Sequence, residues 1–153
     1  RHPQLYLLIV GGTSASEGSD EAVVTALRER TAEAGMSDRV LFTGFRRDTP
    51  RMLRVMDLVA IPSHNEAFGL TVIEAMAAGK AIVGASTGAV PEVLGEAGLL
   101  AVPTDPAALA AQIERLLVDD ALRQQLGQAA RARAEREFSM SHHLDELARR
   151  YLA

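Results

Sequence analysis

The sequence contains no cysteine and no long apolar run. Without cysteine, disulfides, thiolate zinc sites and cysteine nucleophiles are excluded, and a reducing compartment is compatible with the composition. No apolar run reaches the roughly 18 residues that a membrane-spanning helix needs, and the first residues, RHPQLYLLIVGG, lack the cleavage pattern of a signal peptide. We therefore expect a soluble, cytoplasmic protein, with peripheral membrane docking left open for a longer parent chain.

Basic clusters are also lacking. The net charge is −4, and no group of Lys and Arg residues alternates with aromatic residues, which argues against a nucleic-acid partner. Hydrophobic residues make up 48% and charged residues 24% of the 153 residues, which is ordinary for one globular domain. The start on Arg-His-Pro, directly before a predicted strand, indicates a cut from a longer chain.

Short apolar segments alternate with helical segments along the first two thirds of the chain. Buried strands are predicted over residues 5–12, 39–45, 57–63, 81–86 and 98–102. Helices are predicted between them over about 20–34, 50–56 and 70–78, with a short one before the fifth strand. The first is expected to have Val23, Val24 and Leu27 on its apolar side, and the third to have Leu70, Ile73, Met76 and Ala77 on one apolar face. This alternation predicts an α/β fold, a Rossmann-like parallel sheet of about five strands flanked by helices.

The last third of the chain, about 105–153, is predicted to be a helical tail of the same single domain. Asp105 followed by Pro106 is a strong helix start, with Asp as the N-cap and Pro at the first helical position. Either Ser139 or Ser141 is expected to cap the last helix. The Arg-rich run 131–136 alternates with Ala and Glu and is predicted to be a solvated face.

The central stretch, residues 65–92, sets two glutamates, Glu66 and Glu74, on either side of a Phe-Gly break. Seven residues separate them. If most of that interval is helical, the two carboxylates stand on the order of 12 Å apart along the axis. That separation is too large for an acid/base pair acting on one bond. It suits two contacts to one extended ligand.

The start of the predicted 70–78 helix is expected to bind an anion. Its first backbone N–H groups have no partner within the helix, the helix dipole is positive there, and Gly69 lets a phosphate approach closely. Glu66 would repel a phosphate at contact distance, so neutral hydroxyl groups are its better partners. Glu74 could accept from two vicinal hydroxyls, as a ribose presents. These residues together predict a site for sugar, diphosphate and ribose.

These residues carry a resemblance to a known family. The segments LLIVGG, RVLFTGF, DLVAIPS, PSHNEAFGLTVIEAMAAGKAIV, GAVPEV, GLLAVPTDPAALAAQI and FSM occur in this order and cover nearly the whole chain. Together they resemble the donor-binding signature of the family 4 glycosyltransferases, which are retaining enzymes of the GT-B fold that use nucleotide-sugar donors. The resemblance implies that the chain is the donor-binding domain of such an enzyme.

The resemblance also implies roles for individual residues. Glu66 is the catalytic candidate, because it would contact the donor sugar and help the developing oxocarbenium charge. Glu74 would bind the ribose. The backbone amides that would hold the sugar and diphosphate belong to Phe68, Gly69, Leu70 and Thr71. The Phe68 side chain could equally belong to the core, and this alternative stays open.

The predicted ends of the first two strands supply further candidates. The resemblance implies that the nucleotide base lies near Gly44, Phe45 and Arg46. Gly11 and Gly12 could contact the ligand or could simply end a strand, and both possibilities stay open.

Several features of the family pattern are missing from this chain. An Arg and a Lys that neutralise the diphosphate, on a strand and helix expected before Arg1, are absent, as is the N-terminal domain that would hold the acceptor. The expected reaction is therefore glycosyl transfer with retention by a longer protein, without a cofactor or an obligatory metal. The truncated sheet leaves self-association open. A non-catalytic binding or scaffold fragment of GT-B descent and a sugar-nucleotide epimerase remain as alternatives.

Overall fold

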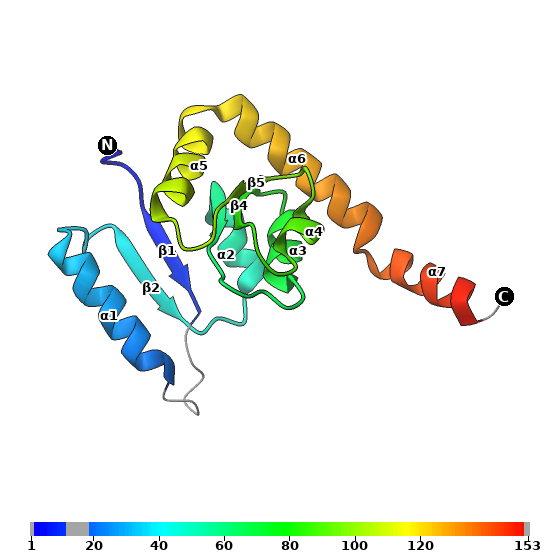
Figure 1. The fold of residues 1–153 in the computed structure, drawn as a ribbon, viewed down its shortest axis with the longest axis horizontal. Helices are drawn as coiled ribbons and strands as arrows, with labels where there is room; N and C mark the ends of the chain where they lie inside the picture. The colour runs from blue at the N-terminus through cyan, green and yellow to red at the C-terminus, as the bar shows by residue number, and fades with distance from the viewer. Residues whose placement is uncertain (1, 12–18, 152–153) are drawn as a thin grey trace. The chain divides into compact units, whose positions relative to one another are not determined.

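The structure, a computed structural model, describes residues 2–11 and 19–151. Its elements, in chain order, are β1 (Leu7–Val10), α1 (Ser19–Glu33), β2 (Val40–Gly44), α2 (Thr49–Val55), β3 (Leu58–Ile61), α3 (Leu70–Ala77), β4 (Ala81–Ala85), α4 (Val90–Leu94), β5 (Leu99–Ala101), α5 (Pro106–Val118), α6 (Asp120–Glu137) and α7 (Met140–Tyr151). They are shown in Figure 1. The chain divides into two compact units, Arg1–Met52 and Leu53–Ala153.

The first unit pairs two parallel strands, β1 and β2. Leu7 lies opposite Val40 and Ile9 opposite Phe42, and the register then shifts between Ile9 and Val10. The intervening helix α1 places the guanidinium of Arg28 over the ring of Phe42, 4.4 Å from its centre. Apolar residues on α1 are largely exposed, as for Val23 at 58%. The sequence predicts an apolar packing side here, and within the described residues that side is only partly covered.

The second unit is built around a three-stranded parallel sheet in the order β3-β4-β5. All five residues of the central strand β4 are buried. Successive side chains of a strand point to opposite faces of the sheet, so a strand that is buried along its whole length must be covered on both faces. The two hydrophobic clusters of the second unit provide this cover.

Each face of this sheet has its own cluster. Ile82 of β4 packs into the larger cluster, with Val72, Ala75 and Met76 of α3 and with α4. Ala81 and Val83 pack into the smaller cluster, which contains Leu116 of α5 and Leu126 of α6. Ala130 and Ala134 of α6 belong to the larger cluster, so this helix contributes to both. The helices thus fix the sheet from both sides and hold its strand ends in place.

The caps predicted for the C-terminal helices are confirmed. Asp105 accepts hydrogen bonds from the backbone N–H groups of Ala107 and Ala108, at 2.9 and 3.0 Å. Ser139, one of the two serines considered for α7, accepts from the N–H of His142 at 3.2 Å. Asp119 ends α5 and also caps α6 by accepting from the N–H of Leu122 at 2.9 Å. Local side-chain chemistry therefore sets these helix starts.

The predicted α/β class, with five parallel strands flanked by helices, is confirmed. The strands are hydrogen-bonded as a pair and a triple, and no ladder between β1 and β3 occurs in the part of the chain that the structure describes. None of the described helices is both long enough and apolar enough to cross a membrane.

Candidate functional site

The start of α3 is shaped by Gly69. This residue has φ of 74° and lies next to α4, because a Cβ on it would stand 3.0 Å from Val93 Cγ2. Both the left-handed backbone and the close contact favour glycine. The carbonyl of Gly69 accepts the N–H of Ile73 at 2.9 Å. The N–H groups of the first turn, which precede Ile73, have no intrahelical acceptor, and they are the groups that the sequence predicts to bind an anion.

Glu66 lies at this helix start. Its side chain is half-buried, and Oε1 accepts a hydrogen bond from the N–H of Gly69 at 3.1 Å. The positive end of the helix dipole stabilises a carboxylate in this position. A carboxylate has lone pairs for several donors, so Glu66 can accept from a ligand hydroxyl while it keeps the Gly69 bond.

Glu74 lies in α3, one turn after the helix start, and is exposed. Within the described residues, no hydrogen bond or ion pair occupies its carboxylate. The same helix start thus carries one carboxylate that is held in place and one that is open to solvent. This arrangement can bind two separate hydroxyl-bearing parts of an anionic ligand.

The other residues near this helix start that are predicted to contact the donor, apart from Gly69, are exposed. Phe68 is 77% exposed and Leu70 is 65% exposed, and Thr71 is exposed as well. The sequence left open whether Phe68 is a core residue, and the structure places it at the surface. Leu70 was expected on the apolar face of α3. That expectation is wrong, because the buried residues are Val72, Ala75 and Met76.

The loop that carries Glu66 is tied to the turn between β4 and α4. The N–H of Ala89 donates to the carbonyl oxygen of Glu66 at 2.8 Å. The hydroxyl of Thr87 donates to the carbonyl oxygen of His64 at 3.2 Å. These bonds connect segments far apart in the sequence, and the residue pattern alone did not point to them.

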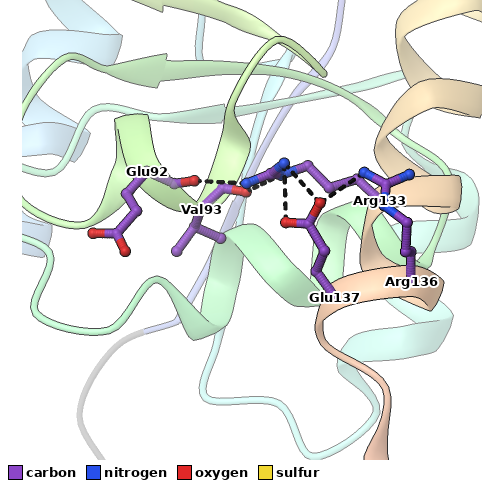
Figure 2. Close-up of polar contacts among 5 residues, drawn as sticks. All are labelled: Glu92, Val93, Arg133, Arg136 and Glu137. Carbon is purple, nitrogen blue, oxygen red and sulfur yellow. Dashed lines mark hydrogen bonds and ion pairs between the residues drawn. The ribbon is translucent and has the colours of Figure 1, made fainter. Parts of the chain in front are cut away.

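The helix α4 is held at its C-terminal end by Arg133 of α6 (Figure 2). Nε of Arg133 donates to the carbonyl oxygen of Val93 and Nη2 to that of Glu92, each at 2.9 Å. Nη1 pairs with Glu137 at 2.9 Å. Since the Arg133 side chain is only 24% exposed, the prediction of a solvated face for the whole run 131–136 is wrong at this residue.

Glu137 is the carboxylate that completes this cluster. The hydrogen bond from Arg136, at 2.7 Å, lowers the pKa of Glu137 below its ordinary value, and the positive charge of Arg133 acts in the same direction. The carboxylate therefore stays ionised near neutral pH and keeps Arg133 aimed at α4.

The remaining candidates lie in the first unit: Gly44, Phe45 and Arg46 for the nucleotide base, and Gly11 and Gly12 for a ligand contact or a strand end. Gly11 and Gly44 sit at the ends of β1 and β2, with φ of 125° and 66°, and the N–H of Gly11 donates to the carbonyl oxygen of Gly44 at 3.1 Å. Phe45 is exposed. The predicted candidate Gly12 falls outside the described residues. The structure thus brings Gly11, Gly44 and Phe45 to one end of a strand pair.

Arg46 follows Phe45 and is engaged by an acidic neighbour. Its Nε and Nη2 donate to the two carboxylate oxygens of Asp48, at 2.8 and 2.7 Å. This paired bond lowers the pKa of Asp48 and raises that of Arg46. Asp48 was not among the residues predicted for the site, although its spacing of two residues from Arg46 was a visible signal. A ligand contact by Arg46 would use the guanidinium N–H groups that Asp48 leaves open.

Similarity to known proteins bears on this site. The sequence profile of the family "Glycosyl transferases group 1" matches residues 1–133. The chain is 40% identical over 137 residues to the D-inositol 3-phosphate glycosyltransferase of Salinispora arenicola, and the match covers 86% of this chain and 30% of that protein.

Two solved structures are similar to this chain in fold. Anabaena Alr3699/HepE in complex with UDP has a TM-score of 0.87 and 30% identity, over 96% of this chain and 40% of that one. Sucrose-phosphate synthase from Thermosynechococcus elongatus has a TM-score of 0.84 and 32% identity, over 98% of this chain and 39% of that one. The chain therefore spans 30–40% of the length of these relatives.

Proposed function

Because this chain belongs to the group 1 glycosyltransferases, we propose that it binds a nucleotide-sugar donor. The donor would serve the transfer of a glycosyl group to an acceptor hydroxyl with retention at the anomeric carbon, as in family 4. The chain has the fold of GT-B glycosyltransferases. Since it spans only 30–40% of the length of its relatives, donor binding is proposed for this chain and the transfer reaction for the longer protein to which it corresponds in part.

The start of α3 carries the proposal. The N–H groups of the first turn donate hydrogen bonds to the diphosphate oxygens, as helix N-termini bind phosphates generally. Glu66 is held beside these amides by the N–H of Gly69, and its carboxylate accepts a hydrogen bond from a hydroxyl of the donor sugar. Glu74, which is exposed one helical turn after the start of α3, accepts hydrogen bonds from the two ribose hydroxyls. The solved relative that contains UDP supports a nucleotide diphosphate as part of the ligand.

The same groups would assist the chemical step. When the bond between the anomeric carbon and the diphosphate breaks, negative charge grows on the leaving phosphate. Backbone N–H groups already aimed at that phosphate stabilise this charge without rearranging, which is a strong source of rate acceleration. Glu66 lies at the sugar end, where its negative charge offsets the positive charge that develops on the ring.

The test is a titration of the protein with UDP, GDP and ADP and with their sugars, followed by calorimetry or NMR. Glu74→Ala should weaken binding of the preferred nucleotide by about tenfold or more, because hydrogen bonds to a charged group contribute roughly 1.5–3 kcal/mol. The 2′-deoxy form of that nucleotide should bind the unmodified protein more weakly than the ribo form. Glu74→Ala should remove this preference.

The matched control is Glu96→Ala, which removes an exposed glutamate outside α3 and should leave the affinity unchanged. A Glu74→Ala protein that still prefers the ribonucleotide would contradict the assignment of Glu74 to the ribose. No binding of any of these nucleotides at millimolar concentration would contradict the proposed function.

A further inference from the structure

The position of the Glu66 carboxylate depends on a loop without regular structure. Residues 62–69 connect β3 to α3 and contain no helix or strand. Each unconstrained residue of such a loop has many backbone conformations available, and fixing it costs roughly 1–2 kcal/mol in entropy. A carboxylate carried by this loop therefore needs backbone contacts that hold its peptide units in one place.

Those contacts come from the turn that begins α4. Thr87 and Ala89 bind the loop through two hydrogen bonds, to the carbonyl oxygens of His64 and Glu66, at 3.2 and 2.8 Å. The two donors flank Gly88, and the two acceptors lie two residues apart in the loop. Because both bonds reach main-chain oxygens, they fix the backbone around Glu66 and leave its side chain free.

Gly88 permits the close approach that these bonds require. Its φ is 57°, and a Cβ on it would stand 2.5 Å from the carbonyl oxygen and 2.8 Å from the nitrogen of Glu66. Real Cβ atoms do not approach backbone atoms this closely, so any side chain at residue 88 would displace the Glu66 peptide. Glycine is also the residue that adopts this left-handed backbone most readily.

The helix that follows this turn is largely buried and bound at its C-terminal end, and it also touches the other end of the loop. Val90 and Leu94 of α4 are fully buried, and Arg133 binds the C-terminal carbonyls of the helix. Val93, on the same helix, lies against Gly69. The turn before α4 therefore contacts Glu66, and Val93 of α4 contacts Gly69. Together these contacts set the position of the Glu66 carboxylate relative to the start of α3.

We propose that Thr87 and Gly88 are positioning residues for Glu66. They hold the backbone of the loop so that the carboxylate stays beside the first turn of α3, at the sugar end of the donor site. The inference rests on the proposed function, since it concerns the same carboxylate. Neither residue needs to touch the ligand. Loosening this contact moves Glu66 but leaves Glu74 and the amides of α3 in place.

This separation gives a specific expectation for binding. Affinity for the nucleotide-sugar should fall, while affinity for the nucleotide diphosphate alone should hold. The gain that the sugar provides is the ratio of the dissociation constant of the nucleotide diphosphate to that of the nucleotide-sugar. We expect Gly88→Ala to reduce this ratio by about tenfold and Thr87→Val by about threefold, in line with the loss of one or two contacts. Thr87→Ser keeps the hydroxyl donor and should restore the gain.

The experiment measures dissociation constants by calorimetry for three pairs of ligands, UDP and UDP-glucose, GDP and GDP-mannose, and ADP and ADP-glucose. The matched control is Gly79→Ala. Gly79 has a similar φ of 68°, but its Cβ would meet no atom closer than 3.8 Å. This variant carries the same backbone strain without a clash against the loop, and it should keep the ratio of the two dissociation constants.

A second readout does not depend on a ligand. The N–H of Ala89 should exchange faster with solvent in Thr87→Val than in the unmodified protein, as followed by NMR, because the loop that supplies its acceptor loses one support. This variant also carries the test if Gly88→Ala does not fold.

The outcomes separate the two proposals. An equal fall in both affinities, an unchanged ratio in a folded Gly88→Ala protein, or an unchanged Ala89 exchange rate would overturn the positioning role while nucleotide binding stood. An unmodified protein that binds nucleotide diphosphates but gains nothing from the sugar would overturn it as well. If no nucleotide binds, the proposed function falls, and with it the role of this contact in donor binding.

Discussion

Replacing Gly127 by alanine should destabilise the protein by about 2 kcal/mol, although glycine-to-alanine changes inside a helix normally stabilise by roughly 1 kcal/mol. Gly127 lies in the middle of α6, and a Cβ there would stand 2.4 Å from the carbonyl oxygen of Gly79. That oxygen belongs to the backbone between α3 and the buried strand β4, so it has little room to retreat. The clash should therefore outweigh the gain in helix propensity.

Equilibrium unfolding in urea is the appropriate measurement. The sequence contains no tryptophan, so circular dichroism of the helices should report the transition. Gln128→Ala changes the next, exposed residue of α6 and serves as the control, with an expected change within about 0.5 kcal/mol. A Gly127→Ala protein that is more stable than the unmodified one would show that α6 does not press against Gly79.

Removing the guanidinium of Arg133 should have an effect of similar size. Arg133→Met keeps much of the apolar stem but loses the bonds to the carbonyl oxygens of Glu92 and Val93. These carbonyls end α4 and would lose charged donors. A buried bond of this kind contributes roughly 1.5–3 kcal/mol, but the bond to Glu92 is exposed, so water replaces much of its contribution. We expect a loss of about 2–3 kcal/mol. Arg133→Lys should restore little, because one ammonium group cannot reproduce the planar fork.

Arg131→Met provides the control for this change. Arg131 lies on the same helix, but its ion pair with Glu135 is exposed, at 64% for both side chains. Exposed pairs of this kind contribute roughly 0–1 kcal/mol. Equal losses of stability in the Arg131 and Arg133 variants, measured by the same urea titration, would argue against a special role for the contact with α4.

Much of the fold is predictable from the sequence because its signals are local. The β4 segment is a short apolar run next to Gly79, and the start of α5 is given by Asp105 and Pro106. Such features act within a few residues, through hydrogen bonds to the neighbouring backbone or through burial on both faces. The same holds for the outline of the candidate site, where Glu66, Gly69 and Glu74 are close in sequence.

The buried face of α3 could not be predicted in the same way. LTVIEAMA is apolar nearly all round, so its periodicity does not decide between Leu70 and Val72. The choice is made by the partners of the helix, since Val72 packs with α4 and with Ile82 of β4. Leu70 stays exposed at the site. Amphipathic patterns are informative only where one face of a helix is clearly polar.

Contacts between distant segments were also beyond reach. The hydroxyl of Thr87 meets a carbonyl 23 residues earlier, and Arg133 meets one 40 residues earlier. Both contacts end on main-chain oxygens, which every residue possesses, so no residue type in the sequence marks the acceptor. Arg133 is therefore indistinguishable in the sequence from the neighbouring surface arginines, and only the packing of α6 against α4 identifies it.

The central position of β4 has a consequence for the order of folding. Its partners β3 and β5 are reached through crossovers of residues 62–80 and 86–98, which are short for parallel strands. Closing such loops costs little entropy, whereas the contacts of α6 with β4 close a longer one. We therefore expect β3, β4 and β5 to assemble first within the second unit, together with α3 and α4. The helix α6, with Gly127 and Arg133, would join them afterwards.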